Sequence, residues 1–154
     1  MFLGTFINKI DKKGRVSIPA SFRSSTHIGK HKNIIAFCSF RLPCIEVCDW
    51  TFFCSLKEQM NQLDLFSQEH DDFMAVIFGE AQAFTFDAEG RIVFPSTFFE
   101  HASIEDQASF VGVGDMFQIW NPNLWNQHKR QAKERLKNQK ISLKRSLYVK
   151  DNEA

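Results

Sequence analysis

The sequence predicts a mainly β protein with flanking helices, an α+β fold assembled from two copies of one unit. The main observation is a repeat: residues 10–19 and 86–95 carry Asp, Gly, Arg and Pro at the same positions, 76 residues apart. The apolar residues between these positions also match, and they alternate with polar ones as in half-buried strands. Because one such unit cannot bury its hydrophobic face alone, we expect the two copies to share a core.

The first copy predicts a β-hairpin. Residues 5–10 and 15–18 alternate like two strands, and Gly14 stands between them where a positive φ is needed. The Asp11 carboxylate can accept hydrogen bonds from backbone N–H groups two or three residues later, which would fix the turn. The second copy predicts the same hairpin over 82–86 and 91–94, with Asp87, Gly90 and Arg91 in the equivalent places.

Each hairpin is followed by a proline that suits the first turn of a short helix. We expect these helices over 20–24, tied to the core by Phe22 and Ile28, and from Pro95 to about His101. Two further strands follow each helix; the expected ranges are 33–40 and 44–48 in the first copy, and 108–113 and 116–120 in the second.

Helical spacing of apolar residues predicts two helices between the copies, over 53–63 and 68–78. After the second copy, Asn121 and Pro122 predict the N-cap and first position of a third helix, which carries Trp125 and then becomes strongly basic. Beyond Lys140 we expect this helix to fray. The expected segments are a first repeat (5–51), connecting helices (52–79), a second repeat (80–123) and a basic C-terminal helix and tail (124–154).

Charge is strongly segregated along the chain, although the formal net charge is only +1. Residues 1–43 carry +7, residues 44–116 carry −12 and residues 117–154 carry +6. Segregation on this scale favours an anionic partner at the basic regions. From charge alone, attraction between the blocks, within or between subunits, is an equally good explanation.

Several functional classes lack their signatures in this sequence. No apolar run approaches the ~18 residues of a membrane span, and no basic stretch precedes a signal-like apolar run, so we expect a cytoplasmic protein without membrane contact. Catalytic elbows, metal-binding H-E-x-x-H and phosphate-binding glycine loops are missing too. We therefore expect no enzyme, no cofactor and no small-molecule substrate.

Four cysteines cluster at positions 38, 44, 48 and 54 without the C-x-x-C spacing of a zinc site. The favoured interpretation is that they are small buried residues in a reducing compartment. A zinc site is the weaker alternative.

The two D-x-x-G-R turns, each followed by an alternating strand and Pro, resemble the paired motifs of the MraZ family, within the AbrB/SpoVT superfamily of β-strand DNA-binding proteins. The start Met1-Phe2-x-Gly4, the segment 112–115 with the following Ile119-Trp120, and Trp125 are also similar to that family. The resemblance covers about residues 1–127. Two departures are Leu3, where many members carry Arg, and the acidic Ala88-Glu89 of the second turn.

The resemblance implies a double-split, swapped-hairpin β-barrel and ring-shaped homo-oligomers. It also implies that the protein is a sequence-specific transcriptional regulator, a repressor, whose partner is double-stranded DNA. The regulator would be nucleoid-associated and would act at direct repeats upstream of the bacterial division and cell-wall gene cluster. The alternative is a ring-forming structural or interaction protein without specific DNA readout.

The first turn carries the candidate DNA contacts. Arginine suits bidentate contact with guanine or phosphate, and a two-stranded ribbon fits the major groove. We therefore assign Arg15 to base or backbone contact, and Lys9, Lys12 and Lys13 to phosphates. Asp11 and Gly14 would shape the turn, but the residues alone leave open that Asp11 and Arg15 only pair with each other or brace the fold.

The second turn differs from the first in the sign of its formal net charge: residues 11–15 carry +2 and residues 87–91 carry −1. Phosphate repels an acidic turn, so we assign Asp87, Gly90 and Arg91 to the fold or to a subunit interface. For the basic tail over 129–150, extra phosphate contact, a solvated helix end and pairing with the acidic block all stay open.

Overall fold

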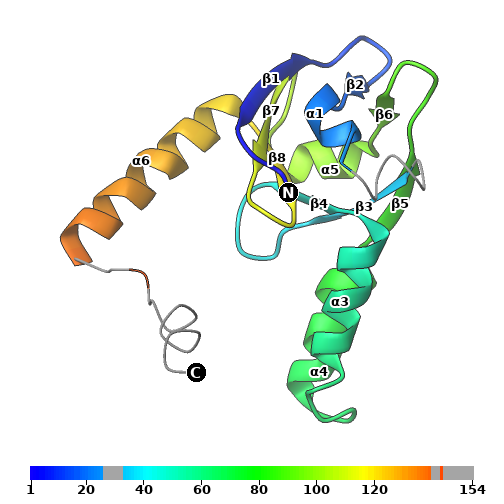
Figure 1. Ribbon diagram of the computed structural model, residues 1–154, viewed down its shortest axis with the longest axis vertical. Coiled ribbons are helices and arrows are strands. Elements are labelled where there is room, and N and C mark those ends of the chain that lie inside the picture. The colour runs from blue at the N-terminus through cyan, green and yellow to red at the C-terminus, as the bar shows by residue number, and fades with distance from the viewer. Residues whose placement is uncertain (26–32, 140–142, 144–154) are drawn as a thin grey trace, which may run out of the picture.

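The computed structural model describes residues 1–25, 33–139 and 143 of the chain (Figure 1). A six-stranded antiparallel sheet, ordered β1-β7-β8-β4-β3-β5, forms the main layer, and a two-stranded ribbon, β2-β6, forms a second one. This is the predicted α+β arrangement of antiparallel strands with helices. The strands are β1 (Thr5–Lys9), β2 (Arg15–Ser17), β3 (Asn33–Cys38), β4 (Ile45–Cys48), β5 (Gln82–Thr85), β6 (Arg91–Val93), β7 (Gln107–Gly112) and β8 (Phe117–Trp120).

The two arms of each expected hairpin pair with the other half of the chain, so the turns form as predicted but the two arms of a hairpin are not paired with each other as a ladder. β1 pairs with β7, β5 pairs with β3, and β2 pairs with β6. Within each hairpin the backbone closes at the tip, where the Asp11 N–H donates to the Arg15 carbonyl (3.0 Å) and the Asp87 N–H to the Arg91 carbonyl (2.9 Å). In the first hairpin an isolated bridge also joins Ile10 to Val16, and Asn8 Nδ2 donates to the Ser17 carbonyl (2.6 Å). The arms separate because each finds its apolar partners across the repeat, as where Phe6 lies opposite Phe110.

The barrel that the resemblance implies is not found as a closed structure among the described residues. β1 and β5 are the two edges of the main sheet, and β2 and β6 pair only with each other. The main core lies between the sheet and the ribbon and takes residues from both halves, which confirms the expected shared core. Val16 and Ile92 lie opposite each other in the ribbon, and both are buried in the main core. Phe22 and its repeat equivalent Phe98 are buried in the same core.

The N-terminal residues close one end of this core. Phe2 donates its N–H to the Gly114 carbonyl (2.7 Å) and accepts from the Gly114 N–H (3.1 Å), while its ring meets Phe22 and Phe117 edge to face. A Cβ on Gly112 would collide with the backbone of Phe2 and Leu3. Gly112 therefore allows the N-terminal segment to cross β7 at close range.

The short helices follow their prolines as expected, with a shift of one position. α1 (Ala20–Arg23) and α5 (Ser96–His101) begin just after Pro19 and Pro95, which occupy the N-cap position with extended ψ values of 138° and 147°. Ile28, expected to tie the first of these helices to the core, lies outside the described residues.

Three further segments form a helical arm that projects from the sheet, as Figure 1 shows. They are α3 (Trp50–Met60), α4 (Gln68–Phe73) and the π-helix η1 (Met74–Phe78). Asp49 caps α3 by accepting the Phe52 N–H, and Ser67 caps α4 by accepting the His70 N–H. The predicted helix over 68–78 thus changes to π geometry part-way, where the Gly79 N–H donates to the Met74 carbonyl.

The arm packs on the face of the sheet that points away from the ribbon. On the arm, Phe53, Met60 and Ile77 are buried, whereas Phe73, Met74 and Phe78 are partly buried. All of these except Met74 belong to a second cluster with Ile35, Phe37 and Cys48.

α6 (Pro122–Gln139) leaves the body on the other side (Figure 1). Asn121 Oδ1 accepts the N–H groups of Asn123 and Leu124, as expected of an N-cap. Trp125 packs on Trp120 in a third cluster, and no residue of the helix is fully buried. The expected fraying beyond Lys140 concerns residues outside the described ranges.

Candidate nucleic-acid interface

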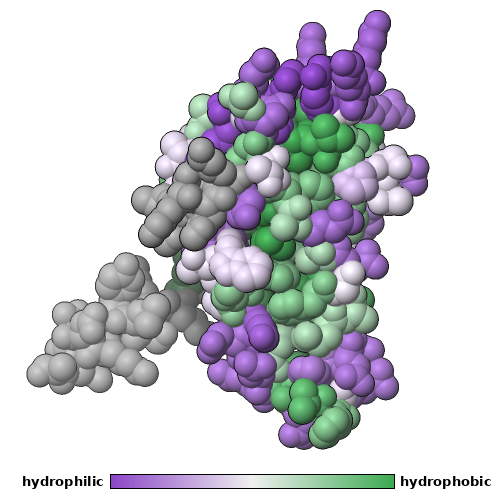
Figure 2. All heavy atoms as spheres, turned by 90° about the vertical axis from the view of Figure 1, so that its right-hand side faces the viewer, coloured by the Kyte–Doolittle hydropathy of each residue, from purple (hydrophilic) through white to green (hydrophobic). Residues whose placement is uncertain are grey.

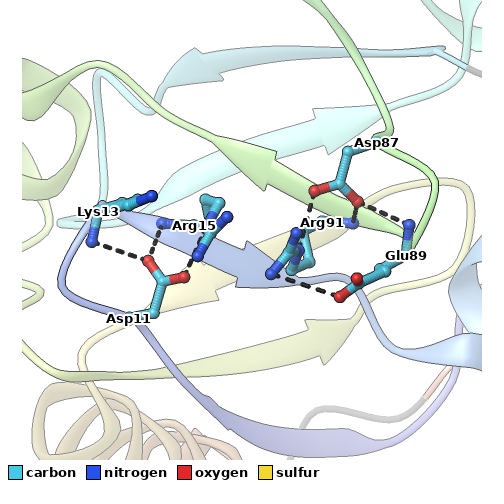
Figure 3. Close-up of polar contacts among 6 residues, drawn as sticks. All are labelled: Asp11, Lys13, Arg15, Asp87, Glu89 and Arg91. Carbon is cyan, nitrogen blue, oxygen red and sulfur yellow. Dashed lines mark hydrogen bonds and ion pairs between the residues drawn. The ribbon is translucent and has the colours of Figure 1, made fainter.

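The two D-x-x-G-R turns lie at opposite ends of the β2–β6 ribbon (Figure 3). In its register Arg15 lies opposite Val93 and Ser17 lies opposite Arg91. Because side chains alternate along a strand, these four residues share one face of the ribbon, and Val16 and Ile92 point into the core from the other. The two arginines are therefore diagonal neighbours on one outward face, with Cα atoms roughly 7–8 Å apart by strand geometry.

The first turn is held by the Asp11 carboxylate. Its Oδ1 accepts the N–H groups of Lys13 and Arg15, both at 2.9 Å, and its Oδ2 accepts from Arg15 Nε at 2.6 Å. These bonds, the Arg15 N–H first among them, hold the pKa of Asp11 below its ordinary value of 3.8. Gly14 takes a φ of +80°, which closes the turn.

The second turn repeats this geometry. Asp87 Oδ1 accepts the N–H groups of Glu89 and Arg91, both at 2.9 Å, and its Oδ2 accepts from Arg91 Nε at 2.8 Å. The pKa of Asp87 is lowered for the same reason, with the Arg91 N–H as the largest cause. Gly90 takes a φ of +77°. The backbone design is thus common to both copies.

The two arginines differ in what their terminal nitrogens meet. Arg91 Nη1 pairs with Glu89 Oε2 at 3.4 Å, so two acids engage one guanidinium, and the pKa of Arg91 is raised chiefly by its hydrogen bond to Asp87. Within the described part of the chain, Arg15 pairs only with Asp11 and only through Nε. Its side chain is also slightly more exposed, at 32% against 24% for Arg91. Arg15 therefore keeps its two terminal amino groups for an external acceptor.

The two turns also differ in what covers their glycines. A Cβ on Gly90 would collide with the side chain of Arg23, whereas a Cβ on Gly14 would have no described atom within 4 Å beyond Gly14 and its two chain neighbours. Arg23 is anchored there by Nε, which donates to the Ile18 carbonyl at 3.0 Å. The second turn is therefore closed over by a side chain from the first half, and the first turn is open.

Arg23 is the residue at this site that sequence reasoning missed. It occupies the position that Phe99 holds in the second copy, so comparing the copies marks the difference. The comparison does not reveal that the side chain crosses to the other turn, because that contact depends on the pairing of β2 with β6.

The lysines assigned to phosphate surround the open turn. Lys12 and Lys13 lie in its loop and Lys9 ends the edge strand β1; all three are exposed. Among the described residues none of the three forms an ion pair, in contrast to Arg91 in the second turn. Figure 2 shows hydrophilic side chains gathered at the end of the molecule where the turns lie.

The sequence matches a known family along nearly the whole chain. Residues 1–75 and 77–145 match the family model described as "MraZ protein, putative antitoxin-like". The chain belongs to the MraZ family. Relatives named "Transcriptional regulator MraZ" include those of Rickettsia bellii OSU 85-389, 41% identical over 145 residues, and Rickettsia akari Hartford, 39% identical over 144 residues. Each alignment covers 94% of this chain and 97% of the relative.

Two of the MraZ-like motifs, at the N-terminus and at 112–115, lie together in the structure. The N-terminal Met1-Phe2-x-Gly4 and the 112–115 segment bond to each other through Phe2 and Gly114, and the Gly112 N–H donates to the Gly4 carbonyl at 2.8 Å. These two motifs hold the end of the core together and lie apart from the turns.

The cysteines, the alternative of a metal site and the question of a membrane span concern parts of the molecule other than the ribbon. Cys44 and Cys48 are buried, Cys38 is half-buried and Cys54 is exposed, and all four are free thiols. The described residues contain no group of three His, Cys, Asp or Glu side chains placed to hold a metal ion. Among the helices described, none is both long and apolar enough to cross a membrane.

Proposed function

We propose that this member of the MraZ family is a sequence-specific DNA-binding transcriptional regulator, and that the open turn around Arg15 is its main contact with DNA. The names of its relatives support the regulatory part of this proposal. The observation that carries the DNA contact is the difference between two turns of identical backbone geometry. One arginine has its guanidinium occupied by two acids, and the other keeps its outer nitrogens unpaired among the described residues.

The ribbon gives Arg15 a suitable approach to a duplex. A two-stranded ribbon fits the major groove, where an arginine can donate two hydrogen bonds to guanine O6 and N7. The Asp11 carboxylate fixes the Nε edge of the guanidinium, which leaves the outer edge pointing away from the turn. Asp11 is then a positioning residue, and its pairing with Arg15 is compatible with DNA contact.

Lys9, Lys12 and Lys13 would supply the sequence-independent part of binding. Exposed lysines without acidic partners can neutralise phosphates and release counterions, which makes affinity fall steeply with salt. We propose that the second turn contributes little, because Glu89 and Asp87 place negative charge on the same ribbon face.

Three finer points belong to the same proposal. The regulator would act as a repressor at direct repeats upstream of the division and cell-wall gene cluster. It would be a homo-oligomer, in ring form, that presents several ribbons to successive repeats. It would associate with the nucleoid in the cytoplasm.

The test is a binding titration of the full chain against DNA from upstream of its own gene, at several salt concentrations. We expect saturable binding of that fragment, weaker binding of a scrambled fragment of equal length, and a log–log salt slope of several units. Replacing Lys12 by Gln should flatten the slope by roughly one unit. Binding of other proteins without any affinity for DNA would instead favour the ring-forming interaction protein.

A further inference from the structure

The face of the main sheet that points away from the ribbon contains a buried carboxylate that forms no ion pair among the described residues. Glu46 of β4 alternates with Ile45 and Val47, which enter the main core, so its side chain lies on the opposite face. The residue is 7% exposed, and among the described residues no basic group forms an ion pair with it. A buried charge without a partner is costly, which makes this position unusual.

A chain of side-chain hydrogen bonds orients the carboxylate. Trp120 Nε1 donates to Gln118 Oε1 at 2.9 Å, which turns Gln118 Nε2 towards both oxygens of Glu46, at 3.1 and 3.3 Å. Gln118 and Trp120 are almost completely buried. The Cys44 thiol also donates to Oε1 of Glu46, at 3.8 Å. A carboxylate offers about four acceptor directions, so these three contacts leave room on Oε2 for one further donor.

Glu46 and Gln118 line a cavity of about 270 Å³. It lies between the helical arm and β8, and its walls are mostly apolar, with Phe37, Leu56 and Ile77 among them. Arg41 is at the cavity too, but its guanidinium lies over the Phe40 ring, 5.9 Å from the centroid, and does not pair with Glu46. The volume is just below the roughly 300–1,000 Å³ of pockets for drug-sized ligands, so an occupant would be smaller than those.

We propose that this cavity binds a small organic cation, with an ammonium group on the Glu46 carboxylate and an aliphatic body against the apolar walls. The ammonium would bring a positive charge into hydrogen-bond contact with Glu46, which Arg41 does not do, and would use the remaining acceptor direction of the carboxylate. The site is separated from the β2–β6 ribbon by the main core, and it does not depend on the proposed contact with DNA.

The proposal is tested by calorimetric titration of the full chain with n-hexylammonium at neutral pH, with hexan-1-ol and hexanoate as matched probes. We expect saturable binding of n-hexylammonium and much weaker binding of the other two. Glu46→Gln keeps the shape and loses the charge, and it should weaken binding roughly 10- to 100-fold, as expected for a charge-assisted hydrogen bond. Glu89→Gln, which removes an exposed acid from the second turn, and Arg15→Ala should leave binding unchanged.

A second readout reports on the site directly. The indole N–H resonance of Trp120 should shift on addition of n-hexylammonium, because that group donates to the glutamine that holds Glu46. Equal binding of hexan-1-ol, unchanged affinity in a folded Glu46→Gln variant, or a static Trp120 resonance would overturn the proposal. A third combination would also overturn it: the wild-type protein binds no n-hexylammonium, and Glu46→Gln changes the oligomeric mass. A basic side chain of a second copy would then occupy the site.

Discussion

Arg15 and Arg91 lie diagonally across the three residue pairs of the β2–β6 ribbon, on one face, each bonded through Nε to the aspartate four positions before it. The fold thus brings the equivalent arginines of the two copies to a single surface. That surface is not symmetric, because Glu89 binds the outer nitrogen of Arg91 and Arg23 covers the turn beside it. The asymmetry comes from two residues that the repeat does not share: Glu89, at a position that differs between the turns, and Arg23, whose equivalent in the second copy is Phe99.

The two turn glycines should differ in their tolerance of a side chain. Gly14→Ala should cost roughly 1–2 kcal/mol of unfolding free energy, because alanine is strained at a φ of +80° but meets nothing. Gly90→Ala should cost slightly more, because the Arg23 side chain would also have to move and give up its hydrogen bond to the Ile18 carbonyl. Urea unfolding of both variants measures the difference.

The Arg23 contact provides the control for that comparison. Arg23→Ala in the Gly90→Ala background should recover part of the lost stability, whereas in the Gly14→Ala background it should recover none. Equal losses of unfolding free energy in Gly14→Ala and Gly90→Ala would contradict the finding that Arg23 covers the second turn and that the first turn is open.

The turn aspartates should contribute stability that depends on pH. The pKa values of Asp11 and Asp87 lie below the ordinary 3.8 in the folded chain, so their contribution is present above that value and is lost as pH falls through the lowered pKa. An Asp11→Asn, Asp87→Asn double variant should be less stable than wild type at neutral pH, and the difference should shrink in acid. Urea unfolding at a series of pH values tests this; a difference that stays constant into acid would argue against it.

Phe2 should be an essential part of the core although it is the second residue. It is 3% exposed and contacts Phe22 and Phe117, so Phe2→Ala should cost roughly 3–5 kcal/mol of unfolding free energy. Leu3→Ala is the matched control, because Leu3 is 67% exposed and its loss should change stability by less than about 0.5 kcal/mol. Thermal or urea unfolding distinguishes them, and similar losses would refute the docking of the N-terminus.

The cysteines should react in order of exposure. Burial raises the pKa of Cys48 to about 12, and Cys54 is exposed on α3. Because the thiolate is the reactive form, iodoacetamide should modify Cys54 first under native conditions, and Cys48 only when the chain unfolds. Mass mapping of the modified chain measures the order, and early labelling of Cys48 would contradict its burial.

The sequence predicts where the strands and helices lie better than how they pair. Local alternation marks residues 5–9 and 15–17 as strands, because burial of one face acts through every second residue. The same alternation favours pairing with the nearest strand in sequence, and the structure instead pairs both segments with the other half. Partner choice depends on contacts more than seventy residues apart, such as Val16 with Ile92, which no local pattern specifies.

The candidate site shows the same limit. Sequence spacing left two roles open for Arg15, and the structure shows that it pairs with Asp11 while its outer nitrogens meet no acid among the described residues. The role of Arg23 could not be predicted, because its contact with Gly90 exists only after the halves exchange strands. The Glu46–Gln118–Trp120 chain was missed for a similar reason, since β4 and β8 carry it from different repeats.

The most direct test of the account is the affinity of Arg15→Ala and Arg91→Ala for DNA from upstream of the gene, measured side by side in gel shifts with both variants shown to be folded. Loss of a bidentate contact costs roughly 1–3 kcal/mol, so Arg15→Ala should weaken specific binding about 5- to 150-fold or more, while Arg91→Ala should stay within about three-fold of wild type. Equal loss in the two variants, or greater loss in Arg91→Ala, would contradict a single open turn as the contact with DNA.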